Sequence, residues 1–81
     1  LKQVKKWKNT QVNQFIKENV QDIVDKRNNE EFETEIINIF IKNKFDGNQL
    51  ISFDQSEWEI SCGFVGKTKD NLLNLIKRSF W

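Results

Sequence analysis

The chain has no histidine, no proline and a single cysteine. One cysteine permits no internal disulfide, and the lack of histidine excludes Cys-His zinc sites, catalytic triads and general bases that use an imidazole. No apolar run approaches the roughly 20 residues that a membrane-crossing helix needs. Residues 1–8 are basic but lead into polar sequence, unlike a secretory signal. We therefore expect a domain excised from an intracellular, cytoplasmic protein.

Aromatic residues are plentiful by contrast. The 81 residues include seven Phe and three Trp, and apolar residues make up 37% of the chain. This composition supports a packed core and argues against disorder. The length is near the lower limit for an apolar core that no disulfide or metal site stabilises. The sequence predicts a single domain over residues 1–81, with its core over about residues 7–79.

The charges are segregated along the chain, although the net charge is only +1. Residues 1–16 carry four Lys and no acid, residues 17–35 have net charge −4, residues 54–60 have −3, and residues 61–81 have +3. Blocks of opposite charge can attract copies of the same chain. Ordinary solvated helix faces would give the same pattern, because an exposed ion pair contributes only ~0–1 kcal/mol. The sequence leaves both interpretations open.

Two helices are predicted in the first half of the chain, where apolar residues recur at helical spacing. The first runs over residues 10–25 with a break near Asn19, and the Asn-containing residues 26–29 end it. The second begins near Glu30 or Glu31, where acids suit the positive end of the helix dipole. Five apolar side chains form its predicted buried face: Phe32, Ile36, Ile37, Phe40 and Ile41.

The Asp46-Gly47 pair is predicted to end the second helix in a turn. Gly47 is expected to supply a backbone conformation that other residues resist. A single helical turn over residues 48–52 follows, with Leu50 and Ile51 pointing inward.

A short helix is predicted over residues 55–61. Asp54 is a good N-cap, because its carboxylate can accept hydrogen bonds from the first free amides. Glu57, three residues later, completes a pattern like a capping box, with Asp in the Ser/Thr place. Trp58 is expected to anchor this helix to the core, and Trp7 is expected to be a core anchor as well.

The last helix is predicted to open near Gly66 or Thr68, after a turn that Gly63 begins. Its apolar stripe consists of Leu72, Leu73, Leu75, Ile76 and Phe80. No segment alternates with the period of a strand between hairpin turns. The predicted fold class is therefore all-α.

The Gly66-Lys67-Thr68 segment at a helix start invites a phosphate-loop interpretation. That motif needs a second Gly five positions earlier, and Ser61 occupies that position. No strand precedes the turn to form the βαβ unit that such loops require. A Gly-rich turn before a helix is the better interpretation.

Two other patterns resemble metal or catalytic motifs without meeting their requirements. A calcium loop centred on Asp46-Gly47 would place Lys42 and Lys44 where carboxylates are needed. The acids in residues 30–35 alternate with apolar side chains and suit the wet face of a helix. We expect no enzyme, no cofactor and no metal site.

The order of these elements resembles the sterile alpha motif (SAM) domain, a five-helix module that serves mainly in protein association. The residues that carry the resemblance are the early Trp7, then Phe40, then Phe45-Asp46-Gly47 with Leu50-Ile51, then Gly63-Phe64-Val65-Gly66, and finally the basic start of the last helix at Lys67. The stretch from Ile16 to Phe40 is longer than usual for the family. The resemblance therefore implies a compact five-helix bundle with a lengthened first-helix region and a long C-terminal helix.

The resemblance also implies a binding mode, in which the start of the last helix docks on the middle of another copy or of another SAM domain. The first of these, the end-helix surface, would comprise Val65, Gly66, Lys67, Thr68 and Lys69. The second, the mid-loop surface, would draw on Asp46, Asp54, Glu57 and Glu59. Because the two surfaces differ, such contacts run head to tail and do not close on themselves.

RNA-hairpin binding is the alternative function, because a subset of SAM domains binds RNA through a basic start of the last helix. Lys67 and Lys69, together with Lys5, Lys6 and Lys8, would then contact phosphates. Against this, the net charge is close to zero, Arg is scarce, and reading unpaired bases usually takes exposed aromatic or Arg side chains. A basic N-terminal membrane-surface helix is disfavoured too, because its apolar face is small. Cys62 is expected to be a small buried apolar residue, and the sequence does not decide whether Trp81 packs on the domain.

Overall fold

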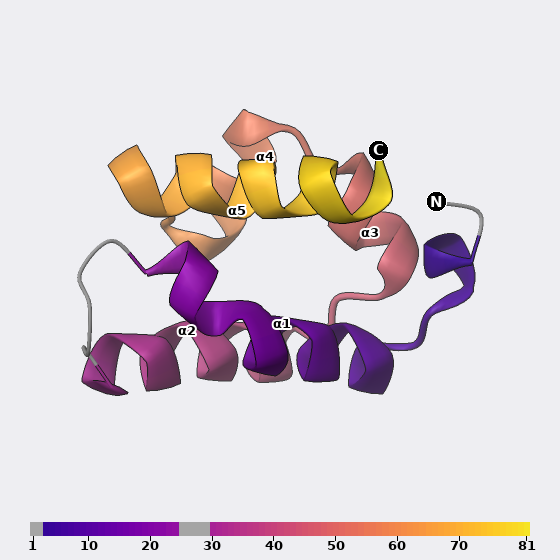
Figure 1. The fold of residues 1–81 in the computed structure, drawn as a ribbon, viewed down its shortest axis with the longest axis horizontal. Helices are drawn as coiled ribbons and strands as arrows, with labels where there is room; N and C mark the ends of the chain where they lie inside the picture. The colour runs from indigo at the N-terminus through magenta and orange to yellow at the C-terminus, as the bar shows by residue number, and fades with distance from the viewer. Residues whose placement is uncertain (1–2, 25–29) are drawn as a thin grey trace.

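The computed structural model describes residues 3–24 and 30–81, and these contain five α-helices, one 3-10 turn and no strand (Figure 1). The elements are η1 (Val4–Lys6), α1 (Asn9–Ile23), α2 (Glu30–Asn43), α3 (Gly47–Ser52), α4 (Gln55–Cys62) and α5 (Gly66–Phe80). The prediction of an all-α fold is confirmed. The Cα radius of gyration is 11.6 Å, close to the value of about 12 Å for a folded chain of this length.

The helices pack in two groups. α1 and α2 lie side by side, and α5 lies over α1 with α4 packed against it (Figure 1). α3 contacts η1, α1 and α5. Near η1 and the end of α5, the ring of Trp7 packs against those of Phe15 and Phe80, with centroid distances of 5.8 and 5.5 Å. The start of α5 therefore lies at the opposite end from η1.

Aromatic side chains from α2, α4 and the turns beside them form the centre of the core. Trp58 has no exposed surface, and its ring centroid lies between 5.0 and 6.3 Å from those of four Phe rings: Phe40, Phe45, Phe53 and Phe64. Trp58 is therefore the anchor that the sequence predicts. Val4 is also buried, so the core begins earlier in the chain than residue 7.

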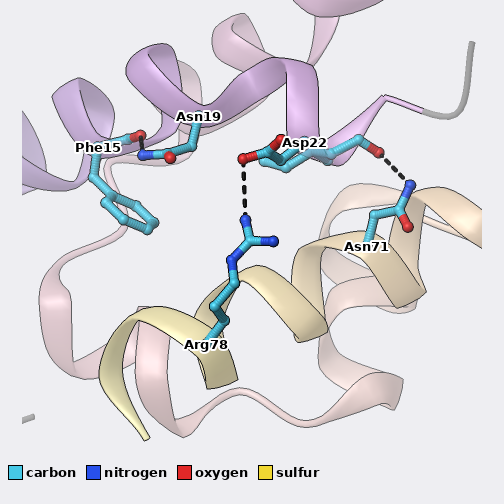
Figure 2. A network of polar contacts seen from close by, with 6 residues as sticks. Phe15, Asn19, Asp22, Asn71 and Arg78 are labelled. Atoms are coloured by element: carbon cyan, nitrogen blue, oxygen red, sulfur yellow. Dashed lines mark hydrogen bonds and ion pairs between the residues drawn. The ribbon is translucent and has the colours of Figure 1, made fainter. Parts of the chain in front are cut away.

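The predicted break in the first helix is wrong. α1 runs without interruption from Asn9 to Ile23, and the Asn19 side chain donates a hydrogen bond to the backbone oxygen of Phe15, at 2.8 Å. The amide is thereby satisfied within its own helix (Figure 2). Helix α1 ends before Val24, and the expected stop in residues 26–29 lies outside the described residues.

One residue of the predicted buried face of α2 lies in solvent. Ile36 and Phe40 have no exposed surface, whereas Ile41 is 49% exposed. Each residue turns the helix by about 100°, so Ile41 rotates away from the face that Ile36 and Phe40 share. Ile39 packs partly against the core instead.

The role predicted for Gly47 is also wrong, although glycine is required there. The left-handed backbone before α3 belongs to Lys44, at φ 52°, and not to Gly47. A Cβ on Gly47 would lie 1.6 Å from the carbonyl oxygen of Val4 and 2.8 Å from the Cβ of Trp7. The Gly47 amide donates to the Trp7 carbonyl at 2.9 Å. Close approach of η1 to α3 therefore demands glycine.

Polar contacts hold α5 against α1 (Figure 2). The Asn71 amide donates to the backbone oxygen of Ile23 at 3.2 Å, which satisfies a carbonyl that the end of α1 leaves free. Arg78 pairs with Asp22 at 3.0 Å. The two contacts lie two turns apart on α5 and join it to the last turn of α1.

Candidate interaction surfaces

The acids of the mid-loop surface hold the starts of two helices. Asp54 accepts a hydrogen bond from the Glu57 amide at 2.9 Å, and Glu57 accepts one from the Asp54 amide at 3.3 Å. Asp46 and Gln49 make the same reciprocal pair at the start of α3, at 2.9 and 3.0 Å. The capping box predicted at Asp54 is thus present. These carboxylates are exposed as well as structural.

The start of α5 is built differently. Its N-cap is Val65, whose side chain makes no capping hydrogen bond and is 65% exposed. Lys67 in the first turn is exposed, and that turn carries no acidic side chain. Gly63 and Gly66, at φ 71° and 60°, occupy the left-handed region that favours glycine. The turn therefore presents an apolar side chain and a cation at an uncapped helix end.

Two of the five residues predicted for the end-helix surface are engaged within the domain. Thr68 is buried, with 8% of its surface exposed. Lys69 forms an ion pair with Glu59, and only 15% of the Lys69 side chain is exposed. Because Glu59 belongs to the predicted mid-loop surface, one residue from each surface pairs inside a single molecule. This leaves Val65, Gly66 and Lys67 as the accessible part of the end-helix surface.

An apolar groove, the α3–α5 groove, lies between α3, the start of α4 and the C-terminal half of α5. Its volume is about 560 Å³. Four apolar side chains form its walls: Ile51, Phe53, Leu73 and Ile76. Four exposed residues surround it: Asp54, Gln55, Lys77 and Trp81. The sequence did not reveal this groove, because its walls come from two segments at least 20 residues apart. It brings Asp54 of the mid-loop surface to the edge of an apolar recess.

Ile60 is a further exposed apolar residue. Its side chain is 83% exposed. It follows the buried Trp58 by two positions, which places it about 200° around the helix from Trp58. That spacing was the signal that could have identified it.

Cys62 is half-buried, as the last residue of α4. Burial raises the pKa of its thiol to about 11, so the thiol stays protonated near neutral pH. It lines a smaller hollow of about 310 Å³ with Phe32, Glu35 and Val65 among other residues. Since the thiolate is the nucleophilic form, this position is unsuited to covalent chemistry.

The described residues contain no group of three His, Cys, Asp or Glu side chains placed to hold a metal ion. Among the described helices, none combines the length and the apolar character that crossing a membrane requires. Comparison with protein-family models, with curated proteins and with solved structures found no match.

Proposed function

We propose that this domain is a non-catalytic protein–protein interaction module that associates head to tail in the manner of a SAM domain. The end-helix surface of one copy would dock on the mid-loop surface of a second copy or of another SAM domain. The observation that carries the proposal is the start of α5, where Val65 and Lys67 are exposed at an uncapped helix end.

The residues at the start of α5 are not those that would stabilise a helix most. A Ser, Asp or Asn at the position of Val65 would cap the helix, and an acid at the position of Lys67 would suit the positive end of its dipole. Residues that break local rules of stability are expected where a surface serves another purpose. An apolar side chain beside a cation suits contact with an acidic protein surface.

The mid-loop surface supplies such a partner. Asp46, Asp54 and Glu57 are exposed on it while they cap α3 and α4. Lys67 of one copy is proposed to approach these carboxylates on the next. Since the two surfaces are different, a pair of copies leaves one end-helix surface and one mid-loop surface free. Further copies can therefore add at both ends.

RNA binding at Lys67 is left as an outcome of the test, since no exposed aromatic side chain among the described residues lies near Lys67. Recognition of unpaired bases needs an aromatic or Arg side chain close to the phosphate-binding cations. The most exposed aromatic ring in the described residues is Trp81, at 73%. It follows the opposite end of α5 from Lys67, about 20 Å away along the helix.

Sedimentation velocity over a wide concentration range, at low and high salt, tests the proposal. Wild type is expected to form a concentration-dependent series of larger species that salt reduces. Lys67→Glu should weaken association, and the double change Lys67→Glu with Glu57→Lys should restore it. Glu57 is chosen because its capping bond, at 3.3 Å, is the longest of the mid-loop caps. Lys17→Glu, on the exposed side of α1, is the matched control.

A wild-type chain that stays monomeric under all these conditions would contradict homotypic association. Hairpin RNAs and unrelated SAM domains would then be titrated as partners. Equal association of wild type, Lys67→Glu and the control would instead place the contact elsewhere on the domain.

A further inference from the structure

The α3–α5 groove has a charge at each side. Asp54, at the start of α4, borders it with a carboxylate, and Lys77, on α5, borders it with an ammonium group. Asp54 and Lys77 are both exposed. Neither forms an ion pair among the described residues. A ligand that fills this groove and carries one charge of each sign would satisfy both.

The start of α5 carries such a pair of charges next to an exposed apolar side chain. Lys67 and Asp70 are exposed and three residues apart, so they lie on the same face of the helix. Val65, 65% exposed, precedes them in the turn. Lys69, by contrast, pairs with Glu59 of its own molecule and does not contribute a free charge to this face.

We propose that the occupant of the α3–α5 groove is the start of α5 from a second copy of this chain. Val65 enters the groove between Ile51 and Leu73, Lys67 pairs with Asp54, and Asp70 pairs with Lys77. This inference rests on the proposed function and deepens it, because it replaces a contact between charged surfaces with an apolar insertion at a defined place.

The size and lining of the groove agree with this occupant. A volume of about 560 Å³ exceeds that of one valine side chain, so the groove also accommodates the aliphatic stem of Lys67. Long charged side chains bury such stems along apolar surfaces while the charged group stays in water. Burial of Val65 and of the groove walls supplies the affinity, and the two ion pairs set the orientation.

Disulfide trapping between two singly substituted chains tests the contact directly. Both chains carry Cys62→Ala, so that each has one thiol. A chain with Val65→Cys is mixed with a chain carrying Gln55→Cys, whose exposed side chain borders the groove. The comparison chain carries Asn48→Cys, which is exposed next to Asp46 on the same acidic surface but does not line the groove. Lys17→Cys, on α1, measures random collision.

The expected result is a mixed disulfide of Val65→Cys with Gln55→Cys that forms at least tenfold faster than with Lys17→Cys. Faster trapping with Asn48→Cys than with Gln55→Cys would overturn the groove contact while the proposed function stands. Trapping at the Lys17→Cys rate for all pairs, together with monomeric sedimentation, would overturn both.

Charge exchange provides a second readout that needs no cysteine. Asp70→Lys is expected to weaken association by about twofold to fivefold, as the loss of an exposed pair does. Adding Lys77→Asp to the same chain should restore it, because the proposed pair is then reversed. If Asp70→Lys associates as wild type does, the assigned orientation is wrong.

Discussion

The starts of α3 and α4 are built differently from the start of α5. At α1 the N-cap Lys8 also makes no side-chain capping bond, although its amide donates to the Gln11 side chain at 2.9 Å. At α3 and α4, Asp46 and Asp54 cap the backbone, and a side chain three residues later completes a reciprocal pair. At α5, Val65 occupies the capping position without a side-chain bond, and Lys67 follows in the first turn. The capped starts of α3 and α4 stabilise the fold, whereas the start of α5 lacks the stabilisation that a capping side chain would give. The start of α5 is therefore the one expected to serve a partner.

The size of this difference is measurable. A capping side chain typically stabilises a helix by about 1 kcal/mol, and a charge suited to the dipole adds about 0.3–1 kcal/mol. Substitutions at α3 and α4 should therefore destabilise the fold, and suitable substitutions at α5 should stabilise it.

The largest expected effect is at the start of α3. Gly47→Ala would place a Cβ 1.6 Å from the Val4 carbonyl oxygen, and η1 would have to move away from α3. The strain should lower the free energy of unfolding by about 1–3 kcal/mol, as overpacking does. Urea denaturation measures the change. Asn48→Ala, at the exposed neighbouring position, is the control, and equal stability of the two variants would contradict the close approach of η1.

At the start of α4, the structural and charge roles of Asp54 can be separated. Asp54→Ala should destabilise the domain by about 1 kcal/mol because a capping acceptor is lost. Asp54→Asn keeps an acceptor and should preserve the melting temperature, but it removes the charge and should weaken association. If Asp54→Asn self-associates as wild type does, the carboxylate takes no part in the contact.

A smaller effect of opposite sign is expected at α5. Lys67→Glu should raise the free energy of unfolding by less than about 1 kcal/mol at low salt, because the acid gains from the positive end of the helix but is repelled by Asp70 three residues later. The same change is expected to weaken association. Urea denaturation at low and high salt would measure the gain, which salt should reduce. A loss of stability would show that Lys67 is needed by the fold.

The fold was largely predictable from the sequence because its signals are local. Apolar spacing located the helices, and the Asp54 and Glu57 pair marked the start of α4 three residues apart. The constraint on Gly47 was missed because it depends on Val4, more than 40 residues earlier. The burial of Ile41 was overestimated because the edge of a helix face depends on its neighbours.

The interaction surfaces were less predictable for the same physical reason. Lys69 was assigned to one surface and Glu59 to the other, yet the packing of α4 against α5 brings them into an ion pair. The α3–α5 groove forms only when α5 closes against α3. The sequence shows where the charged residues are, but it does not show which of them form ion pairs within the domain.

Cys62, the last residue of α4, offers a test of burial through the reactivity of its thiol. Since burial raises the pKa of Cys62 to about 11 from 9.0, alkylation at pH 8 should be about a hundredfold slower than for an ordinary thiol. Any stability that Cys62 contributes is present below pH 9 and is lost as pH rises through about 11. Iodoacetamide labelling followed by mass spectrometry, with and without urea, measures the rate. Equal rates in both conditions would contradict the burial.

Sedimentation velocity of Val65→Ser tests the central claim most directly. Serine is a good N-cap, so this variant should fold at least as stably as wild type while it loses the apolar side chain at the start of α5. Ile41→Ser, which removes an exposed apolar side chain from α2, outside both proposed surfaces, is the control. The account predicts that Val65→Ser stays monomeric at concentrations where wild type and Ile41→Ser form larger species. Association of Val65→Ser at the wild-type level would contradict it.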